Sequence, residues 1–335
     1  MRLIDLHVDW LLQYAGETVV FDPALYPGVA RRLGQAEGYL QATQAAVVSC
    51  YRRADDWGNQ ADPWVALGQL VSRIEAEFPG RLLIGPDDFD RWLDDPDGLA
   101  WAMIGVEGFD ALVRSEADLG RLFPLFERGV RVFQPVYGPT SLLGGSSVPG
   151  DDRGLTDLGR GFLDALLALA PEGPGPRPLL DLAHLNPSAA SDALGWFEAD
   201  PTRSTRVVPI YSHGTVTRDG SGAPRAITPA NLARLRALGG VIGVGVSPPF
   251  FDAVEQVEAA IQAIAATPFL GRVGFEGIAI GTDFLGVDAT LPTLGNADEV
   301  VAWAKKTFDR PSARALLHEN ALDLIARAVG VAHRS

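Results

Sequence analysis

The feature that most constrains the fold of this chain is a series of eight short apolar runs, most of which precede a longer segment with helical periodicity. The apolar residues in these runs are nearly continuous. That pattern is typical of parallel strands that are buried on both faces. The runs cover residues 2–9, 45–51, 101–108, 129–137, 178–185, 206–213, 239–247 and 277–284.

Amphipathic segments between these runs have the sequence signals of helices. Thr156 and Thr228 precede two of them as N-cap residues, and Gly129 and Gly239 follow two of them as C-cap residues. These signals support alternation of strands with helices along the chain. Examples of such segments are residues 62–78, 116–129, 156–170 and 228–240.

Eight strands that alternate with helices predict a closed (β/α)8 barrel. We expect one α/β barrel domain over residues 1–335, with a C-terminal helix and tail over about residues 311–335. An open doubly wound sheet could be drawn from the same alternation. It is disfavoured because none of the runs carries a G-x-G-x-x-G turn.

Composition excludes several classes of partner. The chain has 42 acidic and 28 basic residues and a net charge of −14, which argues against binding to nucleic acid or to an anionic membrane. A signal peptide and a membrane-spanning run are not visible, so we expect a cytoplasmic protein. The single cysteine, Cys50, lies in an apolar run and is expected to be a buried hydrophobic residue.

Residues that can bind metals lie at the ends of the apolar runs. His7 and Asp9 are two positions apart in DLHVDW, so they share one face of a strand. In a barrel, the ends of all these runs open onto the carboxyl-end face, where active sites are built. The residues at these ends are His7, Asp9, Glu107, His184, His213 and Asp283.

Taken singly, each of these residues has an ordinary structural explanation, such as a capping Asp or a surface His at a strand end. As a set, three histidines and three carboxylates can hold two divalent cations bridged by a shared carboxylate and a hydroxide. His318 lies in a helical pattern and His333 in the tail, and both are interpreted as structural or solvent-exposed. The mixed nitrogen and oxygen ligands suit zinc but would also accept manganese or cobalt.

Two further segments carry weaker signals. The Gly- and Ser-rich loop over residues 138–154 is long enough to be a lid or a binding loop. The acidic stretch over residues 87–98 lacks the spacing of a calcium-binding loop, so we interpret it as the solvated face of a helix.

The motifs DLHVDW, GVEGFD, LDLAHL, IYSHGT, GAPRAITPANL and IGTDFLG occur in this order along the chain. In order and spacing they resemble the renal (membrane) dipeptidase family of the amidohydrolase superfamily. The similarity extends from Met1 to about Val329. The resemblance implies a metal-dependent dipeptidase with two zinc ions and a metal-bridging hydroxide. It also implies a homodimer.

The resemblance assigns the metal ligands residue by residue. It implies that His7 and Asp9 bind one zinc ion, that His184 and His213 bind the other, and that Glu107 bridges the two. Many members of the superfamily bridge their metals with a carbamylated lysine. The only lysines of this chain, Lys305 and Lys306, lie far along the sequence from every run end, which independently favours a carboxylate bridge.

The resemblance also implies roles around the metals. Asp283 would be the base for attack by water and then the acid toward the leaving amine, and Arg225 would bind the terminal carboxylate of the substrate. Tyr137 stands where many members have a histidine that stabilises the oxyanion. Tyr137 could donate the same hydrogen bond and contact the substrate, or it could be a packed core residue.

Other departures from the family pattern affect the substrate rather than the metals. Ala226, Leu285 and Gly214 replace commoner residues, and Trp10 could wall the pocket. The leading hypothesis is hydrolysis of dipeptides with a free carboxyl end, including those with a D-residue at the C-terminal position. The alternatives are a hydrolase for a lactone, a cyclic amide or an N-acyl amino acid, and a metal-bound binding module without activity.

Overall fold

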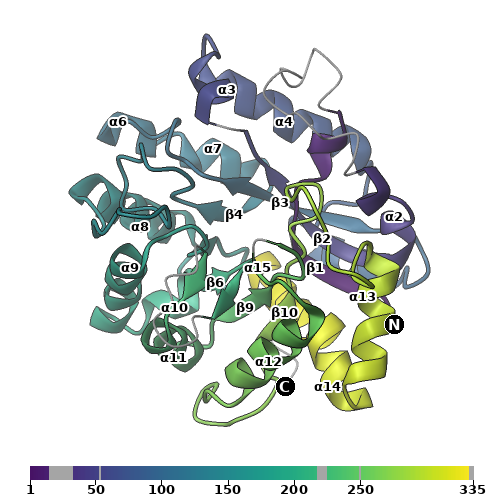
Figure 1. Cartoon of the computed structure of the whole chain (residues 1–335). Helices are drawn as coiled ribbons and strands as arrows, with labels where there is room; N and C mark the ends of the chain where they lie inside the picture. Colours follow the sequence, from purple (N-terminus) through teal and green to yellow (C-terminus); the bar gives the residue numbers. More distant parts are fainter. Residues whose placement is uncertain (15–32, 53, 217–224, 249, 332–335) are drawn as a thin grey trace.

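The computed structural model describes residues 1–14, 33–52, 54–216, 225–248 and 250–331, and it contains a closed barrel of eight parallel strands. The strands follow the order β1-β10-β9-β6-β5-β4-β3-β2 around the barrel, with helices around them (Figure 1). This order confirms the (β/α)8 prediction and excludes the open sheet. The barrel strands are β1 (Leu3–Val8), β2 (Thr43–Cys50), β3 (Trp101–Glu107), β4 (Val130–Gln134), β5 (Leu179–Asp181), β6 (Val208–Tyr211), β9 (Val241–Val244) and β10 (Ile278–Ile280).

Burial explains why the strand runs are apolar throughout. Every residue of β1, β2 and β3 is buried, because one face of each strand lies inside the barrel and the other lies under helices. In the parallel register, Ala46 pairs with Ala102 and Val48 with Ile104. A separate pair of two-residue strands, β7 (Thr215–Val216) and β8 (Ala226–Ile227), follows β6.

The helices begin where the sequence predicted capping residues. The side chain of Thr156 accepts a hydrogen bond from the Gly159 backbone N–H, and that of Thr228 accepts one from the Asn231 N–H. The longer helices are α4 (Pro63–Glu77), α5 (Pro86–Leu93), α8 (Asp157–Leu169), α9 (Pro187–Ala199), α11 (Pro229–Ala237), α12 (Val254–Ala265), α13 (Ala297–Thr307) and α15 (Asn320–Val329). The short helices are α2 (Tyr39–Ala42), α3 (Ala54–Gly58), α6 (Glu116–Leu119), α7 (Leu122–Glu127), α10 (Arg203–Arg206) and α14 (Arg310–Arg314), together with the 3-10 turns η1 (Trp10–Tyr14) and η3 (Leu33–Gln35) and the π-helical turn η4 (Ala315–Glu319).

The segment over residues 116–129 differs from its predicted continuous periodicity. It forms two short helices, α6 and α7, that are separated at Gly120 and Arg121. Glycine weakens a helix interior, and Pro124 lies in the first turn of α7, where its missing N–H leaves no hydrogen bond unmade. Gly129 and Gly239 have φ angles of 105° and 71°, which confirms both as left-handed residues that end helices.

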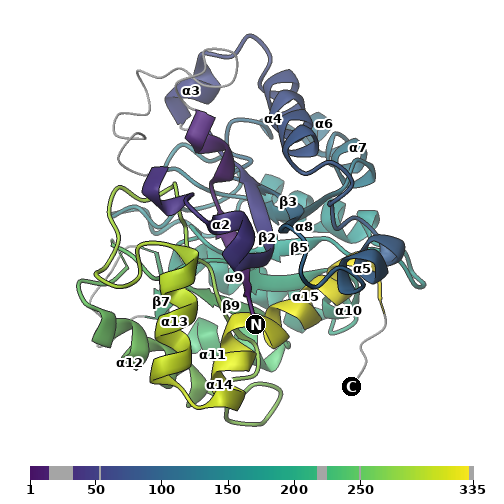
Figure 2. The ribbon, with the colours of Figure 1, turned by 90° about the vertical axis from the view of Figure 1, so that its right-hand side faces the viewer.

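Helix α15 closes the amino end of the barrel. It lies within the barrel outline in Figure 1 and below the strands in Figure 2. Leu324 and Ile325 of α15 belong to one buried cluster with Ile4, Met103 and Ile210 of the strands. The predicted C-terminal helix is therefore part of the barrel core, and the opposite end of the barrel is left for the site.

Several smaller predictions have clear outcomes. Cys50 is fully buried, and the acidic stretch forms α5, whose Phe89 and Trp92 are buried while its carboxylates face outward. His318 is structural, since its Nε2 lies 2.8 Å from Oε1 of Gln44, whereas His333 lies outside the described residues. Among the helices that the structure describes, none is both long and apolar enough to cross a membrane.

The packing of α15 gives a prediction about stability. Leu324 is 1% exposed, so Leu324→Ala should lower the free energy of unfolding by about 2–5 kcal/mol through lost burial and a cavity. Leu99→Ala is the control, because Leu99 is 46% exposed and its truncation should change stability by less than about 0.5 kcal/mol. Urea denaturation measures both, and equal effects would contradict a core role for α15.

Candidate metal centre

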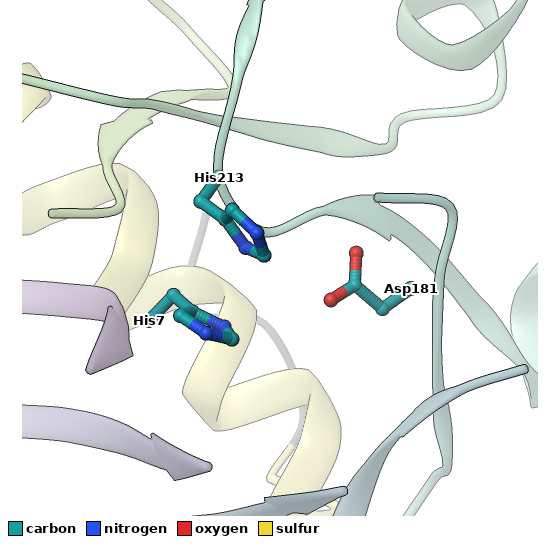
Figure 3. A group of neighbouring side chains, drawn as sticks. All are labelled: His7, Asp181 and His213. Atoms are coloured by element: carbon teal, nitrogen blue, oxygen red, sulfur yellow. The ribbon is translucent and has the colours of Figure 1, made fainter. Parts of the chain in front are cut away.

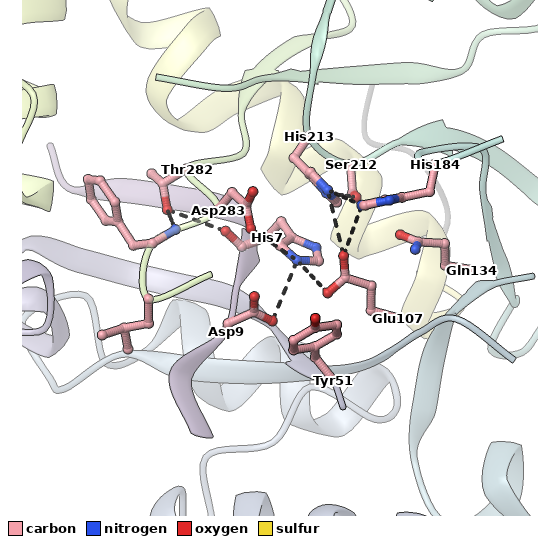
Figure 4. Close-up of polar contacts among 12 residues, drawn as sticks. His7, Asp9, Tyr51, Glu107, Gln134, His184, Ser212, His213, Thr282 and Asp283 are labelled. Carbon is pink, nitrogen blue, oxygen red and sulfur yellow. Dashed lines mark hydrogen bonds and ion pairs between the residues drawn. The ribbon is translucent and has the colours of Figure 1, made fainter. Parts of the chain in front are cut away.

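The structure brings the predicted metal-binding residues together at the carboxyl end of the barrel (Figure 4). His7 lies on β1 and Glu107 ends β3, whereas the others follow their strands by a few residues. All are at most 3% exposed, so the site is a buried polar cluster inside an apolar barrel. The residues that it gathers are His7, Asp9, Glu107, His184, His213 and Asp283.

Glu107 is shared between two groups of side chains. Its Oε2 lies 3.3 Å from Nε2 of His7, and that nitrogen lies 3.8 Å from Oδ1 of Asp9. Its Oε1 lies 3.0 Å from Nε2 of His184 and 3.8 Å from Nε2 of His213. Each group offers three ligand atoms within 4.8 Å of one another, so each could hold one cation with Glu107 in common.

Buried polar atoms without a hydrogen bond support this interpretation. Within the described part of the chain, Nε2 of His7, Oδ1 of Asp9 and Oε2 of Glu107 are buried and have no hydrogen-bond partner. Leaving such an atom unsatisfied costs about 1–3 kcal/mol, so native proteins rarely do it. All three atoms belong to the same group and converge on one point. Imidazole and carboxylate are the ligand types that zinc and similar divalent metals take, so the residues fit a cation.

The buried carboxylates of the cluster stabilise positive charge beside them. Burial lowers the pKa of His7, but the carboxylates of Glu107, Asp9 and Asp283 outweigh burial and raise this pKa to about 10. Burial raises the pKa of Glu107, but His7 and His184 outweigh it and hold this pKa well below its usual value. Buried carboxylates thus favour a proton on His7, and a divalent cation would supply positive charge at the same place.

Asp181 is a site residue that the sequence analysis did not identify. A carboxylate oxygen of Asp181 lies within 4.8 Å of ligand atoms of His7 and His213 (Figure 3). Its Oδ1 accepts hydrogen bonds from the backbone N–H groups of Ala183 and Ser212, at 3.0 and 2.9 Å. Asp181 therefore fixes the chain just before His184 and His213.

Asp5 has the same function beneath His7. Its Oδ1 accepts hydrogen bonds from the backbone N–H groups of His7 and Thr282, at 3.2 and 2.9 Å. Its Oδ2 accepts hydrogen bonds from the hydroxyls of Thr282 and Tyr39, at 2.6 and 2.7 Å. In the sequence, both aspartates precede a histidine inside an apolar run, as D-L-H and D-L-A-H, and this could have identified them.

The backbone turns sharply at three site residues. His184, Arg225 and Asp283 have φ angles of 65°, 63° and 57°, in the left-handed region. This conformation costs a residue with a side chain about 1–2 kcal/mol. Gly214, with φ 151°, has a different reason: a Cβ there would lie 2.4 Å from the Tyr211 ring. Glycine is thus required beside His213.

Arg225 and Asp283 form an ion pair at the edge of the cluster. Nη1 of Arg225 lies 3.2 Å from Oδ2 of Asp283, and Oδ1 of Asp283 lies 3.9 Å from Nε2 of His7. Burial raises the pKa of Asp283 to about 6, although Arg225 and His7 oppose the shift. The Arg225 side chain is 23% exposed, so it faces both the cluster and the solvent side.

Tyr137 lies in the site rather than in the core. Its ring stacks on the His184 ring at a centroid distance of 4.4 Å, and Nη2 of Arg225 lies 3.5 Å from its hydroxyl. The Tyr51 hydroxyl, at the end of β2, lies 3.0 Å from the Tyr137 hydroxyl. Tyr51 was not among the predicted site residues, although it is the last residue of the second apolar run. Trp10 is 5% exposed and packs on Tyr39, so it is a core residue.

The surroundings of the cluster include a cavity and the long loop. A cavity of about 130 Å³ is lined by Glu107 and Tyr137, and Arg52 and Arg114 also line it. In the loop over residues 138–154, the backbone N–H of Ser147 donates to the His184 carbonyl at 2.8 Å. The predicted binding loop therefore contacts a metal-site strand end, and a role as a lid remains a prediction.

Comparison with solved structures finds the same fold. Dipeptidase AC, described as a metallopeptidase of family M19, is 18% identical, with a TM-score of 0.71 and 99% of each chain covered. A metallopeptidase from Rhodobacter sphaeroides, bound to a phosphinate mimic of the dipeptide L-Ala-D-Ala, is also 18% identical, with a TM-score of 0.71 and coverage of 98% of this chain and 99% of that one. An amidohydrolase from Pseudomonas aeruginosa is 16% identical, with a TM-score of 0.67 and coverage of 98% and 96%. No curated protein sequence matches the chain.

The sequence itself matches a family model. The description of that family is membrane dipeptidase, peptidase family M19, and the match covers residues 42–335. The match spans most of the barrel and includes every predicted site residue except His7 and Asp9. It confirms the resemblance on which the site roles were predicted, and it supports a metal-dependent dipeptidase. The chain belongs to the membrane dipeptidase family.

Proposed function

We propose that the protein hydrolyses dipeptides with the help of two zinc ions held at the carboxyl end of the barrel. The observation that carries this proposal is that the two carboxylate oxygens of Glu107 face different groups of buried ligand atoms. Its Oε2 lies near His7, and its Oε1 lies near His184. His7 and Asp9 would hold one ion, His184 and His213 the other, and Glu107 both. When bound, the two ions would supply Lewis acidity and lower the pKa of a water molecule to about 7.

Asp283 is the proton carrier of the proposed reaction. Its carboxylate lies beside the ligand groups without belonging to either triple that contains Glu107. As a base, Asp283 takes a proton from the attacking water, and it then gives this proton to the leaving amine. A buried carboxylate with a raised pKa is suited to both steps near neutral pH.

Arg225 is the proposed partner of the free carboxylate of the substrate. Its guanidinium has more N–H donors than its contacts with Asp283 and Tyr137 use, so a carboxylate can still bind in bidentate fashion. The Rhodobacter sphaeroides metallopeptidase holds a phosphinate mimic of L-Ala-D-Ala. We therefore extend the proposal to dipeptides with a D-residue at the C-terminal position.

Metal content is the first test of this proposal. Elemental analysis should find about two zinc ions per chain, and turnover of L-Ala-D-Ala should be lost on chelation and restored by zinc.

Glu107→Gln should lower the content of both ions, because one carboxylate serves both groups. Glu75→Gln, in a half-exposed pair with Arg128, is the control and should keep both ions. If the purified protein contained no metal and bound none when zinc was added, the proposal would be contradicted.

Asp283→Asn should separate catalysis from metal binding. Asparagine keeps the shape of the side chain and tolerates the left-handed backbone at this position, but it cannot carry the proton. We expect kcat to fall by about 10²–10⁴-fold with zinc content unchanged. Steady-state kinetics and elemental analysis measure the two effects. Full activity of this variant would refute the role of Asp283.

Arg225→Met should distinguish dipeptides from substrates without a carboxylate. Loss of a bidentate charged contact should raise KM for L-Ala-D-Ala by about 10–100-fold. Arg234→Met is the matched control, since Arg234 pairs with Glu198 on the helical surface and should leave KM unchanged. Dipeptide turnover that does not respond to Arg225→Met would favour the alternative of a lactone, cyclic amide or N-acyl amino acid.

A further inference from the structure

We propose that Tyr51 is a positioning residue that fixes the direction in which the Tyr137 hydroxyl donates its hydrogen bond. The inference rests on the proposed function and deepens it. Tyr51 ends the second strand run, Tyr137 ends the fourth, and Arg225 leads into β8. Their polar atoms nevertheless meet on one oxygen, the Tyr137 hydroxyl, at 3.0 Å from Tyr51 and 3.5 Å from Arg225.

The number of donors at that oxygen decides where its proton goes. Arg225 has no acceptor atom, so its N–H must donate to the Tyr137 oxygen. The Tyr51 hydroxyl donates to the same oxygen, which then has both of its lone pairs engaged. The proton of Tyr137 must therefore point away from both partners. Without the Tyr51 hydroxyl, Tyr137 could turn its proton into the space that Tyr51 leaves.

Packing and a backbone hydrogen bond also fix the position of the Tyr137 ring. It stacks on His184, and the Tyr137 backbone N–H donates to Oδ1 of Asp110 at 2.8 Å. The ring of Tyr51 contacts that of Tyr137 at a centroid distance of 4.9 Å, and Figure 4 shows Tyr51 beside Asp9 and Glu107. With the ring fixed, rotation of the C–O bond is the remaining freedom of the Tyr137 donor, and Tyr51 removes it.

This arrangement suits a donor to developing negative charge. The carbonyl oxygen of a scissile peptide gains charge in the transition state, and a pre-oriented donor stabilises that charge without reorganising. Hydrogen bonds received by the Tyr137 oxygen also polarise its O–H bond and strengthen the bond that it donates. Tyr51 thus acts through Tyr137, and neither phenol transfers its proton.

A double-mutant cycle of Tyr51→Phe and Tyr137→Phe tests the inference with L-Ala-D-Ala as substrate. Tyr137→Phe should lower kcat by about 10²–10³-fold, as for the loss of one oxyanion donor. Tyr51→Phe should lower kcat by about 5–20-fold with little change in KM, as for the loss of one hydrogen bond. The double variant should match Tyr137→Phe alone, because Tyr51 has no effect without the hydroxyl that it orients.

Binding of a phosphinate mimic of L-Ala-D-Ala gives a readout independent of turnover. Its tetrahedral centre resembles the transition state, so both single variants should weaken its binding and the double variant should again match Tyr137→Phe. Tyr14→Phe is the matched control, since the Tyr14 hydroxyl donates to Oε2 of Glu77 at 2.6 Å on helix α4. It should leave kcat and phosphinate affinity unchanged.

The outcomes separate this inference from the proposed function. A wild-type protein that binds zinc but neither hydrolyses L-Ala-D-Ala nor binds the phosphinate would refute the proposed function. With an active wild type, unchanged kcat in Tyr51→Phe would overturn the inference. So would additive losses in the double variant, because they would mean that Tyr51 contacts the substrate by itself.

Discussion

The interaction on which the rest of the site depends is the sharing of one buried carboxylate, that of Glu107. Its Oε2 lies 3.3 Å from the Nε2 of His7, and its Oε1 lies 3.0 Å from the Nε2 of His184. A charge with 3% exposure is costly to bury unless opposite charge accompanies it. Because the ligands come from separate strands, that compensation is available only when the barrel is closed. Fold and metal site therefore depend on each other.

Closure of the barrel does not by itself set the directions of the cluster side chains. Asp5 and Asp181 tie neighbouring strand ends together through backbone N–H groups, so His7 and His213 leave the barrel from fixed positions. The left-handed turns at His184 and Asp283 then direct these side chains inward. Strain of this kind persists only where the surrounding structure over-determines it, and in this chain that structure is the hydrogen-bonded layer beneath the cluster.

The histidine and carboxylate cluster and the tyrosines beside it differ in how closely they resemble the family pattern. The motifs that contain His7, Glu107 and His213 resemble the family pattern, whereas Tyr137, which contacts Tyr51 and Arg225, departs from it. A phenol stays neutral and donates one directed hydrogen bond, while an imidazole at the same place could also titrate. In the proposed mechanism the direction of the Tyr137 hydroxyl therefore has to be fixed, and Tyr51 is the neighbour proposed to fix it.

The sequence by itself determined the barrel and the meeting of its predicted site residues at one end, because parallel strands of a closed barrel carry their carboxyl ends to one face whatever the loops do. The order of the runs was therefore enough to predict that His7, Glu107 and His213 would meet. Asp181 was not among those predicted residues. Only the tertiary structure decided the contact of Tyr51 with Tyr137, 86 positions apart. In a sequence, an aromatic residue at the end of an apolar run cannot be distinguished from a residue of the hydrophobic core. Its hydrogen bond depends on side-chain direction, and side-chain direction is set by packing between strands.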